Sequence, residues 1–296
     1  MPTDTQFATE WLEERYRFDV AARNPKVEAA CLQYFARHPD VSIIDMGAGT
    51  GANFIYLSEK FPQSQQWALV ELNPNLLKRA RERLKIWAAA KGYTVREEGQ
   101  NLDFRRSEQH IHVQLLQGSF LELPRLLQPD QFHLVTASAV FDLLSEQMLS
   151  NLVQVFHQNR LALLATLNYE SMAYLPCDAE DDHWIELYEA HMQREQDFGR
   201  ALGPKCSAFL ENCYAQLSTE QMLRAPSRWQ IEPADTLMHG HMLQFLERSL
   251  LEMTHRGHSG KGLNAWLQRK KAALQAQQLR LSVTHSDLFI APVYEG

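Results

Sequence analysis

One stretch near the start of the chain restricts its fold more than any other. It reads VSIIDMGAGTGA and spans Val41–Ala52. An apolar run leads into Asp45, glycines follow at positions 47, 49 and 51, and a helix-like pattern covers 53–60. A strand, a glycine turn and a helix in this order let a backbone approach a nucleotide closely, because glycine leaves room where a side chain would block the approach.

The next apolar run predicts the second strand of a βαβ unit. It spans Gln66–Glu71, reads QWALVE, and is separated from the first strand by one helix. Strands joined in this way lie parallel with a right-handed crossover. Glu71 ends the second strand beside the glycine turn, where a carboxylate can accept hydrogen bonds from both hydroxyls of a ribose. A helix-capping or surface acid is the alternative, and the glycine turn upstream favours the ribose role.

Three more strands are expected along the same sheet. They cover 111–116, 132–137 and 161–167, and an inserted hairpin over about 92–106 precedes the first of them. The third strand leads to Gly118, Ser119 and Phe120, and the fourth leads into Ser138–Asp142. The fifth reads LALLATL, a continuous apolar run that is typical of a strand buried on both faces. Helices are expected between these strands.

Composition excludes several classes of protein. The 296 residues suit one large domain or two small ones, and the net charge of −7 provides no global basic field for nucleic acid or an anionic membrane. No apolar run reaches the roughly 18 residues of a membrane span. The polar, acidic N-terminal stretch does not read as a secretory signal. We therefore expect a cytoplasmic protein without nucleic-acid or membrane partners, and its oligomeric state stays open.

Cysteine and histidine spacing predicts no metal site. The four cysteines form no CxxC pair, which is typical of reduced thiols and not of a disulfide framework or a zinc centre. His239 and His241 form one pair, and His255 and His258 form another, but neither has a nearby Cys or carboxylate at ligand spacing. We interpret all four as surface histidines.

The five βα steps and the DxGxGxG sequence resemble the class I S-adenosylmethionine-dependent methyltransferases. The resemblance is carried by Asp45, the three glycines, Glu71 and the Val135–Asp142 segment, and it covers residues 38–168. A dinucleotide-binding turn differs, because it reads GxGxxG. Two later segments, His191–Pro204 and Ser227–Trp229, are similar to a bacterial subgroup of that family.

The resemblance implies an α/β fold of the Rossmann-like, doubly wound type. Its mostly parallel sheet would have seven strands, with the antiparallel last strand, 281–291, inserted beside the fifth. A single domain would comprise a helical arm (1–37), a cofactor-binding core (38–168), helical lid insertions over the acceptor (169–220), and the last strands and helices (221–296).

The resemblance also implies a cofactor, S-adenosyl-L-methionine, with S-adenosyl-L-homocysteine as the product. The glycine turn would wrap the methionine portion, Asp45 would organise the turn or contact the amino group, and Glu71 would bind the ribose. The family often has an acid at the position of Ser119, which offers a shorter neutral group to the adenine. The expected cofactor-binding residues are Asp45, Gly47, Ala48, Gly49, Gly51, Glu71, Leu72, Gly118, Ser119, Phe120, Ser138 and Ala139.

The N-terminal arm has two interpretations. Apolar residues recur at helical spacing over 11–22 and over 25–37, which predicts two helices that pack over the domain. The alternative is that a polar side chain of the arm reaches the amino-acid end of the cofactor, from among Arg15, Tyr16, Asp19 and Arg23. Packing is the simpler expectation for any single residue, although an exposed crevice needs a cover.

The acceptor site is expected on the loops after the fourth and fifth strands and on the long segment 172–204. Trp184, Tyr188 and His191 fall at helical spacing there, which suits either a packed amphipathic helix or a lid. The expected substrate-binding residues are Phe141, Asp142, Tyr169, Trp184 and His191.

We predict methyl transfer to an oxygen or nitrogen of a small-molecule acceptor by in-line displacement. The predicted catalytic residues are His191, Asp142 and Tyr169. His191 is the first candidate for a general base because its ordinary pKa lies near neutrality. Asp142, Tyr169 and Glu170 are alternatives that the strand order brings closer, and each is more readily a binding residue than a base.

Other functions stay open at this point. An RNA or protein acceptor is one, although the acidic balance and the absence of an NPPY-type motif count against RNA. A non-catalytic, S-adenosylmethionine-binding regulatory protein is another, because intact glycines indicate binding and not turnover. A nicotinamide-dependent oxidoreductase is a weaker alternative.

Overall fold

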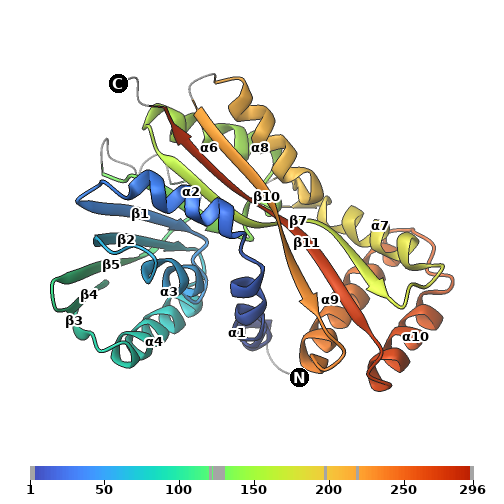
Figure 1. Cartoon of the computed structure of the whole chain (residues 1–296). Coiled ribbons are helices and arrows are strands. Elements are labelled where there is room, and N and C mark those ends of the chain that lie inside the picture. Colours follow the sequence, from blue (N-terminus) through green and yellow to red (C-terminus); the bar gives the residue numbers. More distant parts are fainter. Residues whose placement is uncertain (1–3, 120–121, 123–130, 197–198, 218–219, 294–296) are drawn as a thin grey trace.

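The apolar runs form one long twisted sheet with helices on both faces (Figure 1). The computed structural model describes residues 4–119, 122, 131–196, 199–217 and 220–293. In chain order the strands of the sheet are β1 (Asp40–Met46), β2 (Ser64–Glu71), β3 (Thr94–Glu98), β4 (Asn101–Arg106), β5 (Gln109–Gln117), β6 (Leu134–Ser138), β7 (Ala162–Leu175), β10 (Glu220–Ile231) and β11 (Arg280–Pro292). A separate pair consists of β8 (Glu195–Gln196) and β9 (Gly199–Arg200).

The strand order in the sheet is β10-β11-β7-β6-β1-β2-β5-β4-β3. The five strands from β5 to β7 in this order lie parallel to one another, and the last strand, β11, pairs antiparallel with both β7 and β10. This order confirms the predicted doubly wound, mostly parallel sheet with its antiparallel last strand beside the fifth. The carboxyl ends of β1, β2, β5 and β6 therefore lie along one edge.

Among the described residues the sheet has nine strands, which corrects the predicted seven. The predicted hairpin exists as β3 and β4, and β4 pairs antiparallel with β5, so the hairpin extends the sheet by two strands. Leu102 and Phe104 have no exposed surface and pack in the same core as Phe54 and Trp87. The hairpin is part of the domain core because it covers apolar surface of α4.

The helices divide between the two faces of the sheet. One face packs against α2 (Pro25–Phe35), α3 (Ala52–Ser58) and α4 (Pro74–Ala90), and the other against α6 (Glu146–Gln158) and α8 (Cys206–Ala215). Residues of β1 alternate accordingly: Ile43 lies in the first core and Ile44 in the second. Short 3₁₀ turns are η2 (Phe141–Leu143) and η3 (Gly203–Lys205).

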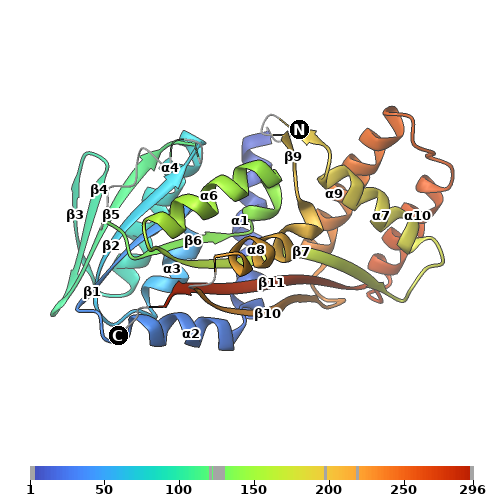
Figure 2. The same ribbon diagram turned by 90° about the horizontal axis from the view of Figure 1, so that it is seen from above.

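A third core surrounds the far ends of the long strands. Figure 1 and Figure 2 show β7, β10 and β11 continuing past the rest of the sheet to α7 (Asp181–Met192), α9 (Thr236–His255) and α10 (Leu263–Gln275). Helix α1 (Asp4–Ala22) also packs there, through Phe18 and Ala22. The molecule thus has a glycine-turn half and a second half, which share three strands.

Strand β7 is longer than the sequence predicted. It covers 14 residues and continues through Tyr169, which was expected in a loop after the fifth strand. At Leu167 the backbone has φ +56°, its N–H donates to Asp287 Oδ1 at 2.8 Å, and the pairing with β11 shifts register nearby. The strand continues because Met172 and Tyr174 are buried while Ser171, Ala173 and Leu175, which alternate with them, are exposed.

Two of the histidines interpreted as surface residues are buried. His239 has no exposed surface and His241 is 9% exposed, because both lie on the inner side of α9. His255 and His258 are exposed, as predicted. Among the described helices, none is long and apolar enough to cross a membrane.

Candidate functional site

The glycine turn has the backbone shape that the sequence predicts. Gly47, Gly49 and Gly51 have φ values of +65°, +55° and +77°, a region that favours glycine. Gly51 begins α3, and a Cβ there would lie 2.5 Å from Leu84 Cδ1. Gly49 faces a cleft, and its nearest side-chain neighbour would be Leu12, at 3.8 Å. The third glycine therefore permits helix packing, while the first two leave the backbone open to a ligand.

Glu71 ties the end of β2 to the glycine turn. Its Oε2 accepts the Gly49 N–H at 3.0 Å and its Oε1 accepts the Asn73 N–H at 2.9 Å. The side chain is half-buried and also lines the cleft. Each carboxylate oxygen has two lone pairs, so both oxygens keep capacity for a hydroxyl donor from a ligand.

Asp45 lies behind the turn and not in the cleft. It is 1% exposed, and its Oδ1 accepts from Asn53 Nδ2 at 2.8 Å. Burial raises the pKa of Asp45 to about 7, against the opposing effects of Asn53 and Arg23. Asn53 also donates to Thr136 Oγ1 at 3.1 Å. Asp45 thus organises the buried side of the turn through Asn53, which in turn faces the cleft.

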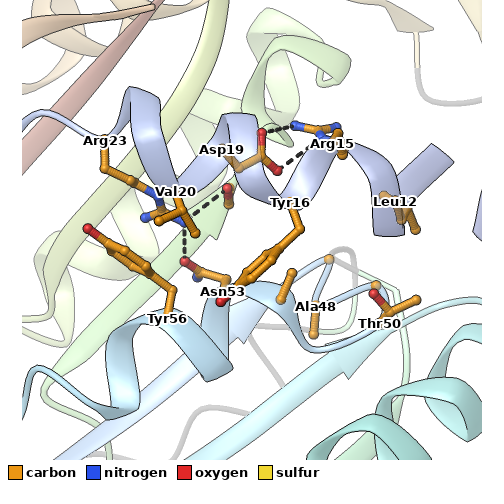
Figure 3. A pocket seen from close by; sticks show the side chains of 14 residues that line it. Leu12, Arg15, Tyr16, Asp19, Val20, Arg23, Ala48, Thr50, Asn53 and Tyr56 are labelled. Carbon is orange, nitrogen blue, oxygen red and sulfur yellow. Dashed lines mark hydrogen bonds and ion pairs between the residues drawn. The ribbon is translucent and has the colours of Figure 1, made fainter. Parts of the chain in front are cut away.

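Helix α1 lies over the turn and brings two guanidinium groups to it (Figure 3). Arg23 Nη2 donates to Asn53 Oδ1 at 2.6 Å and to Ser138 Oγ at 3.3 Å, whereas its buried Nε has no partner among the described residues. Arg15 pairs with both carboxylate oxygens of Asp19, at 3.0 and 3.2 Å. The space between α1 and the turn is narrow, about 60 Å³.

The cleft continues along the carboxyl ends of β2, β5 and β6 as a cavity of about 300 Å³. Most of the residues expected at the cofactor line this cavity, and Leu76 adds an apolar side chain to its lining. The expected residues that line this part are Gly47, Gly49, Glu71, Leu72, Gly118, Ser119, Ser138 and Ala139, while Ala48 lines the narrow part under α1. Asp45 and Gly51 support the turn from behind, and Phe120 lies outside the described residues.

A larger cavity of about 480 Å³ opens next to this cleft, in the second half of the molecule. Ala139, Leu143 and Arg15 line both spaces, so the two adjoin. The walls of the larger cavity are mostly aromatic and aliphatic, and they comprise Trp11, Arg15, Ala139, Asp142, Leu143, Leu167, Tyr169, Met172, Tyr188, Met192, Trp229, Met242, Phe245, Arg248, Val283 and His285.

Few polar groups face this cavity. Asp142 is 6% exposed, and burial raises its pKa to about 6, although the backbone N–H of Tyr169 stabilises the carboxylate. Its Oδ1 has no hydrogen-bond partner within the described parts of the chain. Tyr169 donates its hydroxyl to Glu189 Oε1 at 3.0 Å. His285 is 4% exposed, and burial lowers its pKa to about 3, so its imidazole is neutral.

Three of the residues expected at the acceptor do not line these cavities. Phe141 and Trp184 have no exposed surface, and Trp184 packs beside Trp266 with ring centroids 6.2 Å apart. His191 Nε2 bonds Glu252 Oε2 at 2.8 Å, and its Nδ1 meets Arg194. Burial lowers the pKa of His191. Asp142 and Tyr169 are the expected acceptor residues that the fold brings together.

Several residues of the larger cavity were not anticipated. Val283 and His285 lie two positions apart on β11, so the strand period could have placed both on one face. Trp11, Phe245 and Arg248 come from helices whose inner faces depend on how α1 and α9 pack together. Among the described residues, no group of three or more His, Cys, Asp or Glu is arranged to hold a metal ion.

Comparison with known proteins gives structural likenesses only. No family model and no curated protein matches the sequence. The chain is similar to the cyclopropane synthase MmaA2 from Mycobacterium tuberculosis, with 10% identity, 94% of each chain covered and a TM-score of 0.47. It is also similar to a putative sarcosine dimethylglycine methyltransferase from Galdieria sulphuraria, with 15% identity, 96% of this chain and 97% of that chain covered, and a TM-score of 0.43.

A third likeness is to Haemonchus contortus phosphoethanolamine N-methyltransferase 2, in a complex with S-adenosyl-L-methionine. The identity is 15% and the TM-score 0.44; the alignment covers 99% of this chain and 58% of that one.

Proposed function

We propose that this chain transfers a methyl group from S-adenosyl-L-methionine to a nitrogen or oxygen of a small-molecule acceptor. The observation that carries the proposal is a cleft in two adjoining parts at the carboxyl edge of the sheet. Its first part holds a glycine turn with a carboxylate at the end of the next strand, and its second part is an apolar cavity with a single buried carboxylate. Ligands of doubly wound sheets bind at this edge.

The first part of the cleft fits the cofactor chemically. Glu71 would accept hydrogen bonds from the ribose hydroxyls, while Leu72 and Leu76 offer apolar surface beside Gly118 and Ser119 for the adenine. The amino-acid end would lie under α1, where guanidinium groups match a carboxylate. Arg23 fits that role best, because its buried Nε lacks a partner among the described residues.

The cofactor would supply the activated methyl group, and the chain would position the acceptor and exclude water. Ala139 and Leu143 mark the junction of the two spaces, and Asp142 lies between them in sequence. Asp142 would therefore hold the reacting group of the acceptor or take its proton. Tyr169 would orient it from the neighbouring strand. His191 is not part of this proposal, because it is bonded to Glu252 outside the cavities.

Two observations favour a small acceptor over a macromolecule or a purely regulatory ligand. The larger cavity has a volume within the ~300–1,000 Å³ that is usual for small-molecule sites, and helices α1, α7 and α9 contribute to its walls. A regulatory protein that only binds the cofactor has no need for a second cavity beside it. A cytoplasmic location stays a prediction; the four free cysteines agree with a reducing compartment.

The test is calorimetric titration of the purified protein with S-adenosyl-L-homocysteine and, separately, with NAD. We expect the former to bind and the latter not to. Gly49→Leu should abolish binding because its side chain enters the cleft. Gly99→Leu is the matched control: Gly99 also has a positive φ, +59°, but a Cβ there meets nothing within 4 Å. Binding of NAD alone, or full binding by Gly49→Leu, would reject the proposal.

A further inference from the structure

We infer that the acceptor is an apolar acid, a hydrocarbon or aromatic body with one carboxylate, and that Arg15 holds this carboxylate in the larger cavity. The inference rests on the proposed function and deepens it, because that proposal leaves the charge of the acceptor open. It assigns the group that anchors the acceptor and leaves the reacting nitrogen or oxygen as already proposed.

Positive side chains outnumber negative ones on the walls of the larger cavity. Arg15 comes from α1 and Arg248 from α9, whereas Asp142 is the one carboxylate among the described lining residues. Asp142 contributes little negative surface, because it is 6% exposed and its Oδ1 is buried. His285 is neutral, because burial and the charge of Arg15 lower its pKa to about 3. The charge that these walls offer to a ligand is therefore positive, which suits an anion.

Arg15 keeps hydrogen-bond donors for a ligand beyond those that it uses within the protein. A guanidinium has five N–H donors in a planar fork. The bonds to Asp19 run from Nε at 3.0 Å and from Nη2 at 3.2 Å, and Nη1 bonds to none of the described residues. The edge formed by Nη1 and Nη2 can still donate two parallel hydrogen bonds, a geometry that matches a carboxylate.

The guanidinium of Arg15 is held in place before a ligand arrives. It lies over the ring of Trp229, 5.0 Å from the centroid, and over that of Trp11, at 5.7 Å. Asp19 is among the residues that line the narrow space beneath α1 and not among those that line the larger cavity, whereas Arg15 lines both. A fixed guanidinium lowers the cost of ordering the site on binding. Since Arg23 is assigned to the carboxylate of the cofactor, Arg15 remains for the acceptor.

The rest of the walls suits an apolar body. A volume of about 480 Å³ has room for a ring system or a branched chain. Flexible thioethers adapt to the shape of a hydrocarbon, and aromatic rings provide large rigid surfaces. The methionine and aromatic residues that line the cavity are Trp11, Tyr169, Met172, Tyr188, Met192, Trp229, Met242 and Phe245. A ligand of the inferred class buries its hydrocarbon there and presents its single charge to the guanidinium.

Other acceptor classes fit less well. The rings of Trp11 and Trp229, which could attract a cation, already lie against the cationic Arg15, and two guanidinium groups repel a further positive charge. A neutral acceptor fills the same apolar space, but it displaces water from the Arg15 N–H groups without replacing the lost acceptor. A doubly charged phosphate ester costs more to desolvate between mostly apolar walls.

The test measures binding to the full chain saturated with S-adenosyl-L-homocysteine, at about pH 8. Three probes share one phenylpropyl body and differ in charge: 3-phenylpropanoate, 3-phenylpropanol and 3-phenylpropylamine. We expect the acid to bind at least about tenfold more tightly than the alcohol, as charged hydrogen bonds typically provide, and the amine to bind most weakly. Arg15→Gln should remove the preference for the acid while the alcohol keeps its wild-type affinity. A merely structural role of Arg15 would lower the affinity for both.

Arg17→Gln is the matched control, since it makes the same change on the same helix. Arg17 pairs with Glu14 and Asp235, and it lines neither the narrow space nor the two cavities. This variant should retain the preference for the acid. Arg248→Gln leaves the Arg15–Asp19 pair in place and should reduce the preference in part, so it carries the test if Arg15→Gln does not fold.

The outcomes separate the two proposals. Failure of S-adenosyl-L-homocysteine to bind the wild-type chain rejects the proposed function. If it binds but the acid does not, or the alcohol or the amine binds as tightly as the acid, the acid inference is wrong while the proposed function stands. A preference for the acid that survives both Arg15→Gln and Arg248→Gln also overturns it, because the carboxylate is then held elsewhere.

Discussion

At the scale of single residues, Glu71 connects the end of β2 to the backbone of the glycine turn. Its carboxylate accepts N–H groups from Gly49 and Asn73 and still faces the cleft. In the proposed function, this one side chain both shapes the turn and offers acceptors to the ribose. Asp45 has the complementary position, since it holds the buried side of the same turn through Asn53.

Replacement of Glu71 by alanine should weaken binding of S-adenosyl-L-homocysteine by roughly 1–3 kcal/mol, because charged hydrogen bonds are lost. Titration calorimetry measures the change. Glu98→Ala, on the exposed hairpin, should leave the affinity at its wild-type value. An unaltered affinity in Glu71→Ala would remove Glu71 from the ribose site.

Asp45 predicts a pH dependence of stability. Its folded-state pKa of about 7 lies above its ordinary value of 3.8, so it contributes stability that is complete below pH 3.8 and is lost as the pH rises through 7. The Asp45→Asn variant has no carboxyl group at this position, so it does not lose stability in this way as the pH rises. Between pH 4 and pH 8 the free energy of unfolding of the variant should therefore rise by about 2–4 kcal/mol relative to wild type. Urea unfolding at a series of pH values measures this difference. If the free energy of unfolding depends on pH in the same way in both proteins, the raised pKa of Asp45 is wrong.

At the scale of elements, helix α1 is fastened to the second half of the molecule through Asp19. This carboxylate accepts from Arg15 twice and from Trp229 Nε1 at 3.1 Å. The Arg15 guanidinium also lies over the Trp229 ring, 5.0 Å from its centroid. The helix thereby crosses from the glycine turn to β10, and it covers both parts of the cleft.

Loss of the Asp19 carboxylate should loosen this helix. Asp19→Ala removes hydrogen bonds to charged or buried donors, each worth about 1–3 kcal/mol. We expect faster amide hydrogen exchange in α1 without a change in the central strands, and slower exchange again when S-adenosyl-L-homocysteine binds. Glu14→Ala breaks only a pair with the exposed Arg17 on the same helix and serves as the control. Equal exchange in both variants would show that Asp19 does not fasten the helix.

The elements that the sequence predicted well are those with local signals. The strand, turn and helix from Val41 onward and the hairpin depend on neighbours in sequence. The length of β7 was underestimated because Asn168 and Glu170 interrupt the apolar run, although alternation resumes at Met172. The inner faces of α7 and α9 depend on long-range packing. Helical spacing put Trp184 and His191 on one helix with a role at the acceptor, but it did not show that Trp184 packs beside Trp266 and that His191 bonds Glu252.

At the scale of the whole molecule, strands β7, β10 and β11 belong to both halves. Each contributes 12 to 14 residues to the sheet, and β7 has buried residues in all three cores. Shared strands make it costly to unfold one half while the other stays folded. The boundaries predicted at residues 168 and 220 therefore fall inside or next to continuous strands and are not expected to separate folding units.

A single cooperative unfolding transition follows from this architecture. Differential scanning calorimetry should give one peak whose calorimetric and van't Hoff enthalpies agree. Binding of S-adenosyl-L-homocysteine in excess should move the whole peak to higher temperature. Two resolved transitions, with only one shifted by the ligand, would show that the halves are independent domains.

The placement of Arg15 has a kinetic consequence. It is a wall of the narrow space beneath α1, of the cavity at the carboxyl ends of β2, β5 and β6, and of the larger cavity alike. A ligand in any of these spaces would therefore lie against the same helix. We expect bound ligands to exchange more slowly the more firmly Asp19 and Trp229 hold this helix in place.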